Sequence, residues 1–357
     1  MRVSIIGAGP VGCMAARYGV EEHDVTLYEA LSKRRMQCSG LISKDGLLSL
    51  GIHMKKSLIQ NRVKGARFYS PCGESFMVDG GETKAYVLDR VEFDDYLLDK
   101  IIGWDVDVVE KRVKAGDVRE LVGYNDRVVL ATGTNYGLHR SLNLDMPDEF
   151  LYGAQYEIRV DCDPDFVELH FNNPDFFSWI IPVDEYARVG LCARENPTPH
   201  LHKFIKKLGE NGRVKSYDIR DEHYGVIPLH KPSMRTAYDK VILVGDAAGQ
   251  VKASTGGGVV MGGRAARHLY KSDYDWEWRR QIGNELKTHL MIYRFISQLS
   301  DKNRDRMFSI LSEHKNLLED KGDMDSAIKS LTPLITNPRF VSKLVTSLPS
   351  FAYDILL

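Results

Sequence analysis

The sequence VSIIGAGPVG at residues 3–12, followed by VTLYE at residues 25–29, sets the architecture of this chain. The first stretch predicts an apolar strand, a GxGxxG turn and the start of a helix, and the second predicts another strand that ends in an acid. The glycines permit a tight turn, close approach of a pyrophosphate and close packing of helix on strand. The helix N-terminus then offers N–H groups to phosphate, and the acid is placed to reach a ribose hydroxyl. The pattern predicts a dinucleotide site, with a chance glycine-rich turn as the alternative; the expected residues are Gly7, Gly9, Gly12 and Glu29.

Length and composition set limits on the class of protein. A chain of 357 residues is long enough for about two domains. Its hydrophobic content of 43% and charged content of 27% are those of an ordinary globular protein. The net charge of −1 provides no electrostatic footprint for nucleic acid, so no nucleic-acid partner is expected.

The cysteines and the hydropathy pattern indicate the compartment. The five cysteines are odd in number and lack CxxC spacing, which argues against a disulfide framework and a zinc site. No metal is expected, and a reducing compartment fits this pattern. The chain runs directly into its first strand, so no signal peptide is expected, and it has no apolar run of about 18 residues. We expect a cytoplasmic protein, with peripheral contact to a membrane surface left open.

Further apolar runs define the domain organisation. Residues 128–133 and 241–244 both fit central parallel strands, whereas residues 152–229 are rich in strands with a period of two. Residues 119–122 resemble a short strand, and the chain is almost entirely helical from Trp276 onward. We therefore expect an α/β fold with a Rossmann-type domain, an inserted antiparallel β-sheet substrate domain and C-terminal helices. The expected ranges are 1–62, 84–135 and 236–275 for the dinucleotide-binding domain, 63–83 and 136–235 for the β-rich domain, and 276–357 for the helical region.

A second half of the nucleotide site follows the strand at 241–244. That strand ends in Gly245 and Asp246, where ligands bind in open α/β sheets. Three glycines at 256–258 then open a helix, whose N–H groups and dipole suit the negative charge that develops on a reduced flavin. A structural helix cap is the alternative. Arg90 opens another helix after a strand and can contact a phosphate or the flavin edge; an exposed helix-end arginine is the alternative there.

These motifs together resemble the flavoprotein hydroxylase-type fold and, more narrowly, the geranylgeranyl reductase family, in particular its archaeal digeranylgeranylglycerophospholipid reductase-like flavoproteins. The resemblance covers roughly residues 1–300. Its most family-specific part is the Cys-Ser-Gly loop, and FSWIIP at 177–182 is similar to the family's YxWxFP. The chain departs from the family at Phe177, Ile181 and Ala253, where Tyr, Phe and Pro are usual. The carrying segments are residues 38–44, 63–67, 86–90, 177–182 and 245–258.

The resemblance implies FAD as the cofactor and a set of contacts to it. It also implies that the loop holding Cys38 approaches the flavin, which makes Cys38 a tentative catalytic residue. Three alternative roles fit Cys38: a proton donor, a redox partner or a buried apolar residue. The cofactor contacts implied by the resemblance or by the motifs are Gly7, Gly9, Gly12, Glu29, Cys38, Ser39, Gly40, Arg90, Arg112, Gly245, Asp246, Gly257, Gly258 and Val259.

The activity implied is reduction of the C=C bonds of prenyl chains on archaeal-type membrane glycerophospholipid precursors. It needs a hydride from reduced FAD, a proton, and exclusion of water. Phe177, Trp179 and Tyr156 are candidates to line the prenyl chain, with core packing as the alternative. The expected partners are a prenylated lipid and an electron donor that is ferredoxin, NAD(P)H or another reduced carrier. An FAD-dependent monooxygenase or halogenase, whose WxWxIP pattern FSWIIP approaches, and a non-catalytic flavin-binding protein are the alternative functions.

Overall fold

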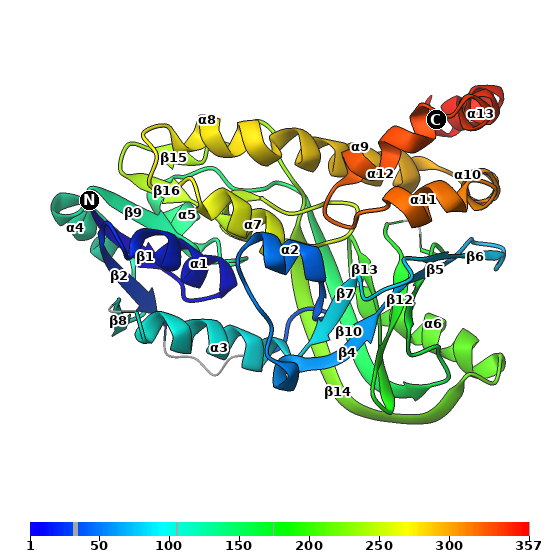
Figure 1. Ribbon diagram of the computed structural model, residues 1–357, viewed down its shortest axis with the longest axis horizontal. Helices are drawn as coiled ribbons and strands as arrows, with labels where there is room; N and C mark the ends of the chain where they lie inside the picture. The colour runs from blue at the N-terminus through cyan, green and yellow to red at the C-terminus, as the bar shows by residue number, and fades with distance from the viewer. Residues whose placement is uncertain (31–34, 105, 174, 357) are drawn as a thin grey trace. The chain divides into compact units, whose positions relative to one another are not determined.

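The computed structural model describes residues 1–30, 35–104, 106–173 and 175–356 (Figure 1). The chain divides into two compact units, and each is built from three separate segments. The first unit contains Met1–Met36, Arg90–Phe150 and Ile227–Lys287. The second unit contains Gln37–Asp89, Leu151–Val226 and Thr288–Leu357.

A six-stranded sheet forms the centre of the first unit, in the order β15-β16-β9-β1-β2-β8. Figure 1 shows β1, β9 and β16, which are far apart in the sequence, side by side. All neighbours are parallel except β15, which pairs antiparallel with β16 at one edge. This confirms the expected Rossmann-type α/β fold. The strands are β1 (Arg2–Ile6), β2 (Asp24–Glu29), β8 (Asp107–Glu110), β9 (Arg127–Leu130), β15 (Ala237–Tyr238) and β16 (Val241–Leu243).

Apolar side chains on both faces of this sheet are covered by helices. Ile5, Val129 and Leu130 are completely buried, as the continuous apolar runs require for strands covered on both sides. The helix after the first strand contacts two others, α3 and α7. The helices are α1 (Pro10–Gly19), α3 (Arg90–Ile102), α4 (Ala115–Tyr124), α5 (Gly137–Leu142), α7 (Val259–Ala266) and α8 (Tyr274–Trp278), with a 3₁₀ turn η2 (Gly245–Ala248).

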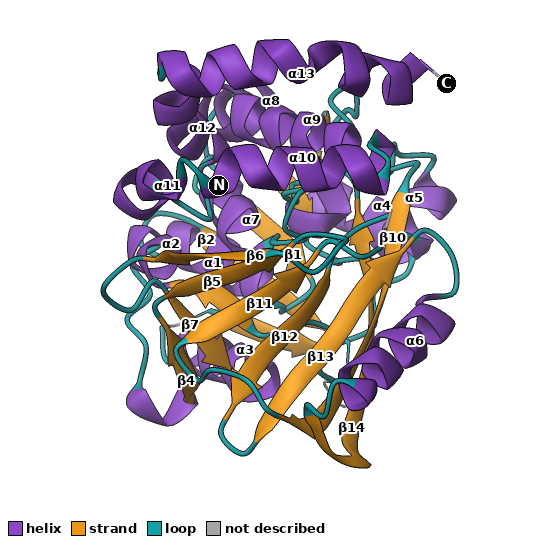
Figure 2. Cartoon of the chain, turned by 90° about the vertical axis from the view of Figure 1, so that its right-hand side faces the viewer, coloured by secondary structure: helices purple, strands orange, loops and turns teal. Residues whose placement is uncertain are grey.

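The second unit contains a seven-stranded sheet, in the order β14-β10-β13-β12-β11-β5-β6, and a three-stranded sheet, β3-β7-β4. In the large sheet β11 and β5 are parallel, whereas β10–β13, β13–β12, β12–β11 and β5–β6 are antiparallel. Figure 2 shows α6 (Pro197–Glu210) against β13. The strands are β3 (Leu41–Ser43), β4 (Ile59–Val63), β5 (Gly65–Tyr69), β6 (Ser75–Asp79), β7 (Ala85–Leu88), β10 (Phe150–Val160), β11 (Phe166–His170), β12 (Ser178–Val183), β13 (Tyr186–Ala193) and β14 (Val214–Pro228); short helices α2 (Lys44–Ser49) and η1 (Lys56–Leu58) precede β4.

Helices make up the C-terminal part of the chain, as the sequence predicted. A π-helical segment η3 (Arg279–Gly283) joins α8 to α9 (Asn284–Gln298). Four helices follow, and α10 and α13 lie side by side (Figure 2). Within the described ranges, no helix is long and apolar enough to cross a membrane. These helices are α10 (Asp301–Ser312), α11 (Lys315–Lys321), α12 (Ala327–Ile335) and α13 (Pro338–Leu356).

Some sequence expectations differ from the structure. Residues 119–122, expected as a strand, belong to α4, because the Asp117 carboxylate accepts a hydrogen bond of 2.7 Å from the backbone N–H of Lys114 and so stabilises the start of a helix there. Residues 37–62 and 84–89, expected with the dinucleotide-binding domain, belong to the second unit, because apolar side chains of β4 and β7 share a core with those of β11 and β12. The segments 136–150, 227–235 and 276–287, expected in the β-rich or helical regions, belong to the first unit.

Candidate functional site

The turn between β1 and α1 is built by glycines with two different functions. Gly7 has a φ of +106°, and a Cβ there would lie 2.4 Å from the carbonyl oxygen of Ala131. A Cβ on Gly12 would lie 1.8 Å from the carbonyl oxygen of Gly7. These two glycines therefore allow strand, turn and helix to pack. A Cβ on Gly9 would meet nothing within 4 Å, so Gly9 faces open space at the N-terminus of α1, where a pyrophosphate can approach.

Glu29 ends β2 beside this turn. Its Oε2 accepts a hydrogen bond of 2.8 Å from the backbone N–H of Ala8. The backbone N–H of Gly7 donates to the carbonyl of Tyr28 at 2.8 Å, so the turn and the end of β2 are held together twice. A carboxylate can accept several hydrogen bonds, so Glu29 can also accept from a ribose hydroxyl. The structure thus brings together the four residues that the sequence predicted from the GxGxxG pattern.

The end of β16 and the start of α7 form a second cluster in the first unit. Asp246 follows Gly245, which has a φ of +71°. A Cβ on Gly258 would lie 2.4 Å from Oδ1 of Asp246, so this carboxylate rests directly against the N-terminus of α7. Burial raises the pKa of the Asp246 carboxyl, and the positive charge of Arg90 opposes that shift. The expected residues Arg90, Asp246 and Gly258 are therefore neighbours, and Gly257 and Val259 flank Gly258 in the chain.

Two expected arginines have different surroundings. Arg90, the first residue of α3, donates from Nε and Nη2 to Oδ1 of Asp94 at 3.1 and 3.0 Å. This contact within one helix holds its guanidinium near Asp246. Arg112 lies exposed in the segment between β8 and α4. In the described part of the chain, Arg112 makes no hydrogen bond or ion pair with the other expected residues.

Thr132 is a residue that sequence reasoning did not assign. It follows β9 at the carboxyl edge of the sheet, beside Gly7, and its buried Oγ1 has no hydrogen-bond partner among the described residues. A buried hydroxyl without a partner is costly, so a ligand that hydrogen-bonds to it fits this position. The signal in the sequence is a hydroxyl residue directly after an apolar run that ends in small residues.

The loop with Cys38, Ser39 and Gly40 belongs to the second unit. The backbone N–H of Gly40 donates to Sγ of Cys38 at 3.3 Å. The backbone N–H of Leu41 lies 3.4 Å from Oγ of Ser39. Both side chains are half-buried, so the thiol is partly accessible. The loop leads directly into β3.

The candidate substrate-lining residues do not all share one face of the large sheet. The rings of Phe177 and Trp179 lie 6.3 Å apart, and Nε1 of Trp179 donates to Oε1 of Gln155 at 2.9 Å. Tyr156 is the next residue along β10, so it points to the opposite face. There it is buried in the core against α6, and its hydroxyl lies 3.1 Å from Nε2 of His202. The structure thus brings Phe177 and Trp179 together but not Tyr156.

Several archaeal proteins are similar to this chain over most of its length. An uncharacterised protein of Methanocaldococcus jannaschii is 30% identical in an alignment that covers 90% of this chain and 92% of that protein. A protein of Methanothermobacter thermautotrophicus named digeranylgeranylglycerophospholipid reductase 2 is 26% identical and covers 79% and 83% of the two chains. No protein-family model matches the sequence.

Solved structures share the fold. A geranylgeranyl bacteriochlorophyll reductase-like protein of Thermoplasma acidophilum has a TM-score of 0.79 at 21% identity, covering 97% of this chain and 98% of that one. The flavin-dependent halogenase CmlS has a TM-score of 0.64 at 18% identity and covers 98% and 78%. The fold is a Rossmann-type α/β fold of the kind found in flavin-dependent enzymes. Within that class, the chain belongs to the geranylgeranyl reductase family.

Proposed function

We propose that this protein is an FAD-dependent reductase that saturates C=C bonds of prenyl chains, specifically geranylgeranyl chains on archaeal-type membrane glycerophospholipid precursors. The observation that carries the proposal is the GxGxxG turn with Glu29 hydrogen-bonded to it, in a chain whose relatives bear the name digeranylgeranylglycerophospholipid reductase. The same fold occurs in halogenases, so the fold alone does not select the reaction.

The residues of the first unit fit an FAD molecule. The open space at Gly9 and the N–H groups of α1 suit the pyrophosphate, and Glu29 suits a ribose. Gly258 and the N-terminus of α7 suit the end of the flavin where negative charge develops on reduction. Asp246 adds a hydrogen-bonding carboxyl there, and the hydroxyl of Thr132 gains a partner when a ligand binds beside Gly7.

FAD, when bound and reduced, supplies the hydride for this reaction. The chain itself must hold the lipid, exclude water and deliver a proton to the second carbon of the double bond. Cys38 is our candidate for that proton, because the Gly40 amide fixes its thiol and the thiol is partly accessible. The rings of Phe177 and Trp179 provide an apolar surface for a prenyl chain.

The proposal also includes an electron donor and a cellular location. The electron donor is ferredoxin, NAD(P)H or another reduced carrier. The protein acts in the cytoplasm, with peripheral contact to the membrane that contains its substrate.

Oxygen dependence separates the proposal from a monooxygenase or halogenase. The protein, loaded with FAD and reduced by dithionite without excess reductant, is mixed anaerobically with a digeranylgeranyl glycerophospholipid, and the absorbance of oxidised flavin is followed. We expect that absorbance to return without oxygen, and not to return with the fully saturated lipid as the control. Return only after oxygen is admitted would contradict the reductase. Because reduced flavin also reacts with oxygen directly, an oxygenated or halogenated product would then favour the oxygen-dependent alternatives, and return with no product would favour a non-catalytic flavin-binding protein.

A further inference from the structure

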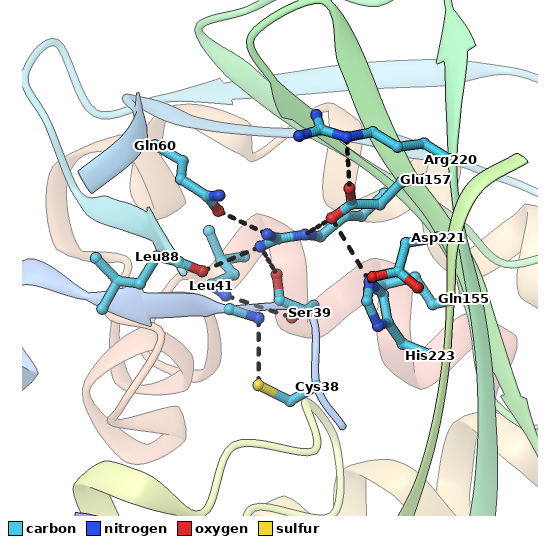
Figure 3. A network of polar contacts seen from close by, with 12 residues as sticks. Cys38, Ser39, Leu41, Gln60, Leu88, Gln155, Glu157, Arg220, Asp221 and His223 are labelled. Carbon is cyan, nitrogen blue, oxygen red and sulfur yellow. Dashed lines mark hydrogen bonds and ion pairs between the residues drawn. The ribbon is translucent and has the colours of Figure 1, made fainter. Parts of the chain in front are cut away.

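Arg188 is a charged residue with only 1% of its surface exposed, in the interior of the second unit. It lies in β13 directly opposite Glu157 of β10, and its Nε donates to Oε1 of Glu157 at 3.0 Å. Glu157 in turn lies 3.6 Å from Nε2 of His223 and 4.0 Å from Nε of Arg220 (Figure 3). A buried charge is tolerated only when it is paired and hydrogen-bonded, so this cluster holds the Arg188 guanidinium in one orientation.

The other two nitrogens of the Arg188 guanidinium, Nη1 and Nη2, bind residues that lie outside the large sheet. Its Nη1 donates to the carbonyl oxygens of Ser39 and Leu88 at 2.8 and 3.1 Å. Its Nη2 donates to Oε1 of Gln60 at 2.6 Å. Gln60 lies in β4 and Leu88 ends β7, so Arg188 joins the large sheet to the three-stranded sheet. Arg188 also binds the carbonyl of Ser39, which lies one residue after Cys38 and just before β3.

The contact between Arg188 and the Ser39 carbonyl requires a glycine at position 40. The φ of Gly40 is +75°, and a Cβ there would lie 2.6 Å from Nη1 of Arg188 and 2.4 Å from the carbonyl oxygen of Leu88. Without a side chain, Gly40 receives a hydrogen bond from the Leu88 N–H at 3.0 Å and donates its own N–H to Sγ of Cys38 at 3.3 Å. The sulfur is therefore connected to Arg188 through a single peptide group, whose carbonyl belongs to Ser39 and whose N–H belongs to Gly40.

We propose that Arg188, oriented by Glu157, is a positioning residue for Cys38. It fixes the Ser39 carbonyl and the strand end at Leu88, and these fix the Gly40 amide that orients the thiol. The relevance of this arrangement to catalysis rests on the proposed function, whereas the positioning itself does not. An ion pair that merely joins two sheets is the competing explanation, and the two differ in what happens at Cys38 when the unit stays folded.

Alkylation of individual cysteines separates these explanations. The full-length protein is treated with iodoacetamide under non-denaturing conditions, and the rates at Cys38 and Cys192 are measured by mass spectrometry of peptides. Cys192 lies in β13 with 1% of its surface exposed, so it reports loosening of the second unit as a whole. In Arg188→Met we expect the rate at Cys38 to rise on the order of fivefold or more, with the rate at Cys192 unchanged, because local opening needs far less free energy than unfolding.

The matched control is Arg213→Met. Arg213 donates from Nη2 to Oε1 of the buried Glu168 at 2.6 Å in the same unit, without a contact to the Cys38 loop. We expect this variant to leave the rate at Cys38 within about twofold of that of the unchanged protein. An equal increase in both variants, or no increase in Arg188→Met, would overturn the proposal.

A conservative variant covers the case in which Arg188→Met unfolds. Arg188→Lys keeps the charge opposite Glu157 but cannot reproduce the fork of donors to Ser39, Leu88 and Gln60. If Cys192 also becomes reactive in Arg188→Met, Arg188→Lys decides. An increase at Cys38 alone supports positioning, and an increase at both cysteines or at neither overturns it.

Failure of the proposed function can be recognised separately. The alkylation rates need neither FAD nor a prenyl lipid, so they test positioning even if the protein reduces no lipid. If the protein does reduce prenyl lipids, we expect Arg188→Lys to lower kcat more than it raises KM, because the substrate surface is intact while the thiol is misplaced.

Discussion

The glycines of the first turn show how one residue type serves two purposes. Gly12 has no room for a side chain, because the Gly7 carbonyl occupies the space. Gly9 has room for a side chain, and its role is to leave space for a pyrophosphate to approach the turn. A substitution to alanine therefore has different consequences at the two positions.

We expect Gly12→Ala to destabilise the protein by about 1–3 kcal/mol, since turn and helix must move apart. Gly9→Ala should leave the free energy of unfolding within about 0.5 kcal/mol but weaken FAD binding roughly tenfold, since the methyl group occupies the space for the pyrophosphate. Urea unfolding of the apoprotein and titration with FAD measure the two effects. Unchanged FAD affinity in Gly9→Ala would show that the pyrophosphate does not pass this turn.

Cys38 leads to a second prediction at the scale of a single residue. We expect Cys38→Ala to keep FAD bound and to slow alkene reduction roughly 100-fold, the usual contribution of a proton donor. Cys72 is an exposed cysteine in the same unit, in the turn between β5 and β6, and Cys72→Ala is the matched control with unchanged turnover. Single-turnover oxidation of reduced flavin by the lipid measures both. Equal rates in the two variants would remove Cys38 from the mechanism.

At the scale of elements, the sequence predicted what is local. The helix from Arg90 and the apolar strands β9 and β16 occur where the sequence pattern indicated. The pairing of β3, β4 and β7 was not predictable, because these strands are separated in the chain and no feature of the sequence around each strand indicates which strand it pairs with.

Glu157 and Arg188 were missed for a related reason. They are polar residues in strands of alternating character, which normally indicates a face exposed to solvent. In the structure they are buried, because Gln60 and Leu88 of the three-stranded sheet lie against Arg188. A covered polar face and a solvated one have the same sequence pattern.

The buried pair gives a pH prediction. His223 and then Arg188 outweigh the effect of burial and hold the pKa of Glu157 at about 2, well below its usual value of 4.5. Because the folded-state pKa is the lower one, the unfolded chain takes up the proton first as the pH falls. The stabilisation is complete above the unfolded pKa and is lost between about pH 4.5 and pH 2, on the order of 3 kcal/mol in total.

Glu157→Gln tests this prediction, because its amide does not titrate. At pH 7 we expect it to be less stable than the unchanged protein by about 3 kcal/mol, since a buried pair is broken. In urea unfolding at several pH values, the difference between the two proteins should shrink as the pH falls from about 5 toward 2. A difference that is constant with pH would show that Glu157 is not an ionised partner of Arg188.

At the scale of the whole molecule, each unit is assembled from three segments of chain. The GxGxxG pattern with its following acid was enough to predict the Rossmann-type fold, because its residues are neighbours in sequence. Asp246 and Gly258 could be assigned because their motif is also local, and the structure brings them close to Arg90. Tyr156 shows the limit, since its position on one face of a sheet depends on pairing that the sequence does not state.

Mass spectrometry of a digeranylgeranyl glycerophospholipid, incubated anaerobically with the FAD-loaded protein and dithionite, tests the proposed reduction most directly. We predict that the lipid gains mass in steps of two hydrogens, one step for each double bond that is reduced. Two controls should give no gain in lipid mass: the protein without FAD, and dithionite with free FAD but no protein. An unchanged lipid mass with FAD bound and reduced would contradict the account.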